Sequence, residues 1–194
     1  MGKTRLEAFS DGVIAIIITI MVLELKVPEE ATWEALRPVL PKFMSYLLSF
    51  IFIAIYWNNH HHLLHLVKHI SAGIMWSNIN LLFWLSLIPF ATAWMGENHF
   101  EPKPVSLYAI VLALCGLAYN ILQKAIEVCH RSDVRLKEIM NSQKRKGILS
   151  FVILTSAIPL AYVNTLISGI LFTTIVAMWI IPDKKIEKIT SEEN

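Results

Sequence analysis

Four stretches of this chain contain no Asp, Glu, Lys or Arg, and their lengths limit what it can fold into. They cover 43–67, 70–96, 104–123 and 147–182, which is 25, 27, 20 and 36 residues. A helix that crosses the ~30 Å hydrocarbon core of a bilayer needs about 20 residues. Charged residues make up 16% of the chain, against ~25% in soluble domains. The sequence therefore predicts an all-α membrane protein, and its composition excludes a disordered chain, a coiled coil and a nucleic-acid-binding tail protein.

These runs and an apolar segment near the N-terminus predict six transmembrane helices. The run over 147–182 would be ~54 Å long as one helix, which is too long to cross once. Because it contains Pro159, Asn164 and Gly169, we expect two short spans joined by a tight turn. The N-terminal segment is interrupted by acidic residues but rich in Ile and Val, so we include it. The expected spans are 7–27, 42–67, 71–96, 104–128, 148–163 and 166–181, in a single domain over 1–194.

Six spans place both termini on one side, and the positive charges agree with this topology. The terminal side receives 13 of the 17 Lys and Arg residues, and the other side receives Lys26, Arg37, Lys42 and Lys103. Since cytoplasmic loops carry the excess of positive charge, we expect both termini to be cytoplasmic. The basic connector over 130–146 is then an orientation signal, partly helical, or a contact for anionic lipid. Pro89 and Pro159 are predicted to kink their helices.

The first span has two faces at the helical rotation of about 100° per residue. Thr19, Ile20 and Leu23 lie within about 60° of Ile16 and form one stripe. That stripe is suited to lipid, to a neighbouring helix or to a symmetry axis. Ser10 and Asp11 point more than about 100° away from it. A carboxylate at membrane depth is costly in lipid, so this polar face needs partners inside the protein.

Candidate partners gather at the same depth in the second and third spans. They are Trp57, Asn58, Asn59, His60, His61, His62, His65, Trp76, Asn78 and Asn80. His61 and His65 have the i,i+4 spacing of a metal pair, but their span holds no Cys, Asp or Glu as a third ligand. We therefore favour hydrogen bonds to Ser10 and Asp11, or exposure to water at the cytoplasmic mouth, and expect no metal, haem or other cofactor.

Enzymatic and conventional channel motifs are missing. Ser10-Asp11 has no nucleophile-elbow glycines and no recognisable oxyanion-hole segment, so we expect no enzyme. The chain also lacks a TVGYG-like loop, the filter motif of conventional potassium channels. Cys115 and Cys129 lie ~21 Å apart along one helix and cannot form a disulfide within the chain.

Several motifs nevertheless resemble a known family. The segment 5–12 matches R-x-x-x-F-S-D-[GA] at the start of a first span, through Arg5, Phe9, Ser10, Asp11 and Gly12. Further matches are Tyr56-Trp57, Asn59-His60-His61, Trp76-x-Asn78 and Pro89-Phe90-x-Thr92. The first half of the chain thereby resembles the transmembrane protein 175 family of potassium channels, in its bacterial form with one six-span unit. The later spans match only in hydropathy.

The resemblance implies a homotetramer in a membrane, with the first helices around a central pore. Ile16, Thr19, Ile20 and Leu23 would form a hydrophobic constriction, and the motif residues would tie the pore helix to Trp57, Asn78 and His60 or His61. Glu24 would attract cations at the outer mouth or pair with Lys26. We expect a potassium channel with weak selectivity over sodium, in lipid of a bacterial inner membrane, conducting monovalent cations and binding no nucleic acid. The alternative is a proton-coupled or cation carrier that uses Asp11 and the histidines of the second span.

Overall fold

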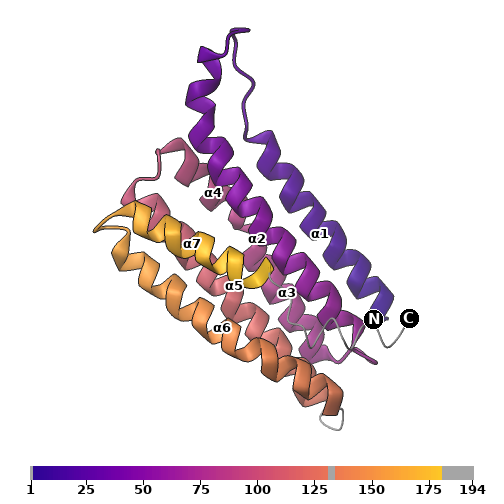
Figure 1. Cartoon of the computed structure of the whole chain (residues 1–194). Coiled ribbons are helices and arrows are strands. Elements are labelled where there is room, and N and C mark those ends of the chain that lie inside the picture. Colours follow the sequence, from indigo (N-terminus) through magenta and orange to yellow (C-terminus); the bar gives the residue numbers. More distant parts are fainter. Residues whose placement is uncertain (1, 131–133, 181–194) are drawn as a thin grey trace.

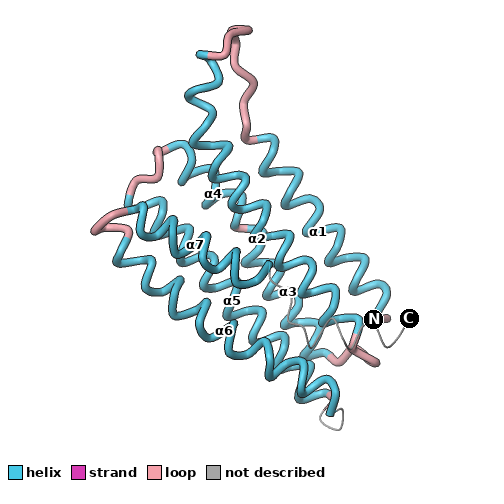
Figure 2. Tube along the Cα trace, in the orientation of Figure 1, coloured by secondary structure: helices cyan, strands magenta, loops and turns pink. Residues whose placement is uncertain are grey.

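The computed structural model describes residues 2–130 and 134–180, with the side chains of 134–139, 141 and 142 excepted. Every regular element in these ranges is a helix (Figures 1 and 2), so the all-α prediction is confirmed. The helices, in chain order, are α1 Lys3–Leu23, η1 Glu34–Val39, α2 Leu40–His65, α3 Ala72–Ser86, α4 Ile88–Glu97, α5 Pro102–Cys129, α6 Val134–Leu160 and α7 Thr165–Ile180.

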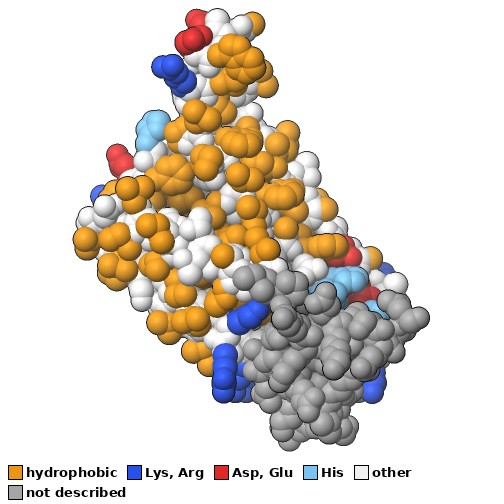
Figure 3. Space-filling model, viewed as in Figure 1, with side chains coloured by type: hydrophobic (Ala, Val, Ile, Leu, Met, Phe, Trp, Pro, Cys, Tyr) orange, Lys and Arg blue, Asp and Glu red, His pale blue; other side chains and the backbone are white. Residues whose placement is uncertain are grey.

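Four of these segments are long and apolar enough to cross a membrane. They are Lys3–Leu23, Glu34–His65, Ala72–Glu97 and Pro102–Cys129. The last three contain the predicted spans 42–67, 71–96 and 104–128 to within two residues, whereas α1 begins and ends four residues before the predicted span 7–27. Figure 3 shows hydrophobic side chains over the middle of the visible face, with charged residues towards its ends. Such a surface is unsuited to water and suited to acyl chains.

The last apolar run folds as two antiparallel helices, with a turn at 161–164 between α6 and α7. Asn164 stabilises this turn, since its Oδ1 accepts a hydrogen bond from the Leu166 N–H at 2.9 Å. The α6 helix differs from the predicted span over 148–163, because it begins at Val134, inside the basic connector. That connector is rich in good helix formers such as Lys, Arg and Gln and contains no proline. Residue 181, the expected end of the last span, lies outside the described residues.

The third span is divided at the position that Pro89 predicts. Proline has no N–H to donate and its ring obstructs the preceding turn. The α3 helix ends at Ser86, Leu87 caps both segments, and α4 begins at Ile88. Beyond the break, Ser49 Oγ lies 2.7 Å from Thr92 Oγ1 and 2.9 Å from the Tyr108 hydroxyl. These bonds join α4 to α2 and α5.

Successive crossings alternate in direction, with α3 and α4 together forming one crossing. The connections between crossings therefore fall at two ends of the bundle (Figure 1). The start of α1, the loop over 66–71 and the end of α5 lie at one end, which we call the inner end. The α1–α2 connection and the turns at 98–101 and 161–164 lie at the other. In the packing, α5 contacts α3, α4, α6 and α7, whereas α1 lies at the edge and contacts α2, α3 and α4. One face of α1 is therefore left uncovered by the described parts of the chain.

Candidate functional site: the first helix and its polar anchor

The two faces of α1 have very different exposure. The face that packs against the bundle is buried and consists of Leu6, Ser10, Ile14, Ile17 and Met21. On the opposite face, the exposed fraction is 59% for Ile16, 44% for Ile20 and 75% for Leu23, and Thr19 is also exposed. The stripe identified from helical periodicity is thus the uncovered surface of the helix. Among the residues that the structure describes, nothing covers this aliphatic surface.

Thr19 lies within this stripe, and its hydroxyl is already engaged. Its Oγ1 donates to the Ala15 carbonyl at 2.8 Å, one turn earlier in the same helix. The donor is therefore occupied, while the oxygen keeps its two lone pairs as acceptors. The side chain can offer an acceptor to a cation or to water without losing its bond to the helix.

A chain of buried hydrogen bonds holds the opposite face of α1 to α3 and α2. The Asn78 Nδ2 donates to Ser10 Oγ at 2.9 Å, and Ser10 Oγ donates to the Leu6 carbonyl at 2.8 Å. The His60 Nε2 lies 2.6 Å from Asn78 Oδ1. Since an amide oxygen can only accept, His60 Nε2 carries the proton. Ser10, Asn78 and His60 are at most 1% exposed, so each bond is shielded from water.

Asp11 has a different partner. The Trp57 Nε1 donates to Asp11 Oδ1 at 2.9 Å, which gives the carboxylate a charge-assisted hydrogen bond. The His61 ring stacks on Trp57 with centroids 5.9 Å apart, and the His65 ring stacks on His61 at 6.4 Å. Within the described residues no histidine bonds to Asp11. Of the two histidines that the resemblance suggested, His60 therefore reaches α1 through Asn78, and His61 only supports the tryptophan.

The remaining motif residues lie elsewhere on the helix. Arg5, Phe9 and Gly12 are exposed within the subunit, although the resemblance placed them in the same anchor as Ser10 and Asp11. The reason is rotational, because Phe9 and Gly12 fall within about 40° of Ile16 around the helix axis. A tie that the sequence did not suggest is Lys3, whose Nζ donates to the His65 carbonyl.

An apolar groove runs beside the exposed stripe. Its volume is about 560 Å³, and it lies between α1 and the junction of α3 and α4. Its lining residues are Val13, Ile16, Ile17, Ile20, Glu24, Ser86, Pro89, Phe90 and Ala93. Glu24, at the end of α1, is exposed there and belongs to neither ion pair found among the described side chains, which are Lys3–Glu7 and Lys42–Glu97. Its suggested pairing with Lys26 is therefore not formed.

Comparison with known proteins identifies the family to which this architecture belongs. Residues 5–89, which include most of α1 and the residues of its anchor, match the family described as "Endosomal/lysosomal potassium channel TMEM175". A potassium channel of a Chryseobacterium species is 48% identical over 99% of this chain and 100% of its own length. The chain belongs to the TMEM175 family. It is therefore an integral membrane protein of a channel family that has bacterial members, which agrees with the sequence-based prediction.

The fold agrees with that family as well. The crystal structure of a lysosomal potassium-selective channel TMEM175 homolog from Chamaesiphon minutus superposes with a TM-score of 0.77. The two are 25% identical, and the match covers 91% of this chain and 95% of the other. A rat TMEM175, described as an endosomal/lysosomal proton channel, is 31% identical over 65% of this chain and 28% of its own length. The family thus includes proteins described as potassium channels and proteins described as proton channels.

Proposed function

We propose that this protein is a potassium channel in which the first helices of four subunits surround the ion path. The observation that carries the proposal is the exposed stripe of Ile16, Thr19, Ile20 and Leu23, opposite a buried polar anchor. In a subunit that worked alone, this stripe would be an unremarkable lipid-facing surface. In a ring of subunits, the same stripe faces its own copies around an axis.

The anchor supports this reading because it sets the rotation of α1. Ser10 and Asp11 are bonded to α3 and α2, on one side of the helix. With that side held, Ile16 and Ile20 are turned outwards, beyond the edge of the subunit. A helix meant only to face lipid has no need of a fixed rotation, since hydrocarbon is the same in all directions. A helix that lines a narrow path does need it.

Selectivity in such a path comes from dehydration. Rings of aliphatic side chains disfavour water, so an ion that passes them sheds part of its hydration shell and receives little in return. Potassium holds its water less tightly than sodium and is therefore favoured. We expect weaker discrimination than a ring of backbone carbonyls provides. The Thr19 oxygens supply limited coordination, and the exposed Glu24 carboxylates raise the cation concentration at the outer mouth.

The assembly and its placement follow from the same arrangement. We propose a homotetramer in a bacterial inner membrane, with six spans in the single domain 1–194 and both termini cytoplasmic. The inner end carries Lys3, Arg5, Lys68, Lys124 and Lys144 among the described residues, consistent with the excess of positive charge expected there. The groove beside the stripe provides room for an apolar side chain from a neighbouring subunit.

The test is single-channel recording from purified protein in a planar bilayer with potassium and sodium on opposite sides. We expect unitary steps and a reversal potential that favours potassium. Ile16→Asn should wet the constriction and change both current and selectivity. Val22→Asn is the matched control, since Val22 is 43% exposed on the same helix but lies off the stripe. Equal behaviour of the two variants would remove Ile16 from the path.

The second candidate is a proton-coupled or cation carrier, and the stacked rings beside Asp11 are the observation that favours it. Trp57, His61 and His65 form a column that continues from the carboxylate towards the inner end. A carrier gives slow, saturable exchange without unitary steps. The same bilayer recording, repeated in a proton gradient, therefore separates the two functions.

A further inference from the structure

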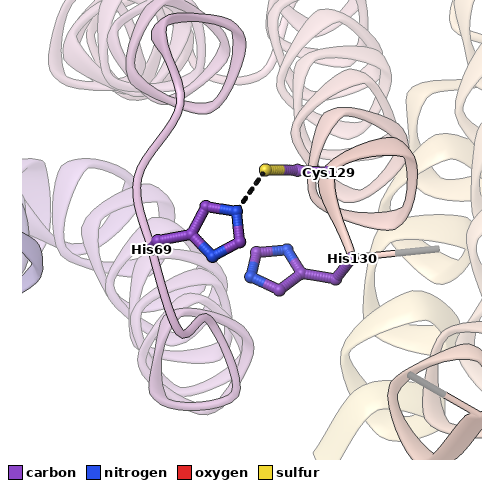
Figure 4. Close-up of side chains that lie close together, drawn as sticks. All are labelled: His69, Cys129 and His130. Atoms are coloured by element: carbon purple, nitrogen blue, oxygen red, sulfur yellow. Dashed lines mark hydrogen bonds between the residues drawn. The ribbon is translucent and has the colours of Figure 1, made fainter. Parts of the chain in front are cut away.

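Three side chains with metal-binding atoms meet at the inner end of the bundle, away from α1. His69 lies on the loop over 66–71, and Cys129 and His130 lie at the end of α5 (Figure 4). One potential ligand atom from each lies within 4.8 Å of the others. The loop and the helix end are about 60 residues apart in sequence, so only the tertiary fold brings them together.

The spacing of these atoms suits a tetrahedral ion. The His69 Nε2 lies 3.3 Å from Cys129 Sγ, and the edge between a nitrogen and a sulfur ligand of Zn²⁺ is about 3.6 Å, from bond lengths of about 2.05 and 2.3 Å. The rings of His69 and His130 have centroids 4.6 Å apart and are inclined by 34°. Since the three ligand atoms lie within 4.8 Å of one another, the longest separation exceeds a tetrahedral ligand edge by about 1 Å.

The hydrogen bonds of His130 fix a tautomer that suits a metal ligand. It is 6% exposed, and its Nδ1 lies 3.1 Å from the Ile126 carbonyl. A carbonyl only accepts, so Nδ1 carries the proton and Nε2 has the lone pair. Histidines that bind metals usually donate their other N–H to a carbonyl or carboxylate in this way. In the chain by itself, Nε2 accepts from the Lys68 N–H at 3.2 Å, a bond that a metal ion would replace.

We propose that His69, Cys129 and His130 form a transition-metal site, best suited to Zn²⁺. Two imidazoles and a thiolate are ligands for zinc and its neighbours, whereas Mg²⁺ and Ca²⁺ require oxygen. Binding releases the Cys129 thiol proton, so one ligand of the ion is a negatively charged thiolate. His69 is exposed, which leaves a fourth position open to water. The ion would clamp the loop between α2 and α3 to the end of α5.

The first test uses Co²⁺ as a spectroscopic substitute for Zn²⁺ on purified protein without a histidine tag. Binding through a thiolate gives a sulfur-to-cobalt charge-transfer absorption, which Zn²⁺ should remove on competition. Cys129→Ser should abolish this band and weaken Zn²⁺ affinity by more than about tenfold. Cys115→Ala is the matched control, because Cys115 lies on the same helix but away from the site, and it should leave the band intact. A band that survives in Cys129→Ser overturns the proposal.

The second test needs no cysteine variant. Cys129 is partly exposed and Cys115 is buried, so a maleimide applied to the folded protein reports on Cys129. Zn²⁺ should slow this labelling, Mg²⁺ should not, and His69→Ala should remove the protection. His61→Ala is the control, since it disrupts the exposed pair His61 and His65 and should leave protection unchanged. Equal labelling rates with and without Zn²⁺, or protection lost only in His61→Ala, would refute the assignment.

Discussion

The hydrogen bonds of Asn78 offer the most direct test of how the first helix is held. Substituting Asn78 with Ala removes two buried bonds, one to Ser10 and one to His60. A side-chain hydrogen bond within a membrane protein contributes about 0.6–1.7 kcal/mol. We therefore expect the free energy of unfolding to fall by about 1–3 kcal/mol, which includes the cost of leaving the His60 N–H without a partner.

The measurement is a detergent-driven unfolding titration in mixed micelles, followed by the fluorescence of the native tryptophans. Asn80→Ala provides the matched control, because Asn80 lies two residues along the same helix, is less buried and has no part in the anchor. The double variant His60→Leu with Asn78→Leu should cost less than the sum of its single variants, since replacing both partners leaves no orphaned polar group. If Asn78→Ala and Asn80→Ala are equally stable, the bond to Ser10 does not hold α1. If the double variant is additive, His60 and Asn78 are not coupled.

Two further substitutions probe other contacts. Trp57→Phe keeps a ring for His61 to stack on but removes the N–H that donates to Asp11. It should lower the unfolding free energy by about 1–2 kcal/mol and alter ion selectivity in bilayer recordings. Unchanged selectivity would mean that this hydrogen bond has no role in conduction. Gly96→Ala would place a Cβ 2.8 Å from the Lys42 Cα and should lower the unfolding free energy by about 1–3 kcal/mol through overpacking. Gly169→Ala is the control, because its Cβ would have no atom within 4 Å. Thermal melts of both variants in detergent test this, and equal melting temperatures would contradict the close approach at Gly96.

The helices and the two faces of α1 were predictable from sequence because both depend on local periodicity. An uncharged run of about 20 residues has few alternatives to a transmembrane helix. A rotation of about 100° per residue is enough to group Ile16 with Ile20 and Leu23. The break before Pro89 was equally predictable, since it follows from a missing N–H in a single residue. These features require no knowledge of which helices are neighbours.

The partners of each polar group were less predictable, because they depend on how helices pack. Helical spacing placed His60, His61 and Trp57 near Asp11 but did not decide which one bonds to it. The clamp of Gln143 between Gln123 and Asn59, which joins α6 to α5 and α2, has no sequence signal beyond the presence of amides. The proximity of His69 to Cys129 and His130 could not be predicted for the same reason. The sequence-based expectation of no metal site rested on the ligands available within the second span alone.

The interruption between α3 and α4 divides one crossing of the membrane into two halves with different hydrogen-bond partners. The inner half carries Asn78, which is attached to the first helix, while the outer half carries Thr92, which is attached to Ser49. A sideways displacement of the first helix would thus act on the inner half through a hydrogen bond and on the outer half through the packing of α1 against α4. Because the backbone ladder is interrupted at Leu87, the two halves can respond to such a displacement by different amounts.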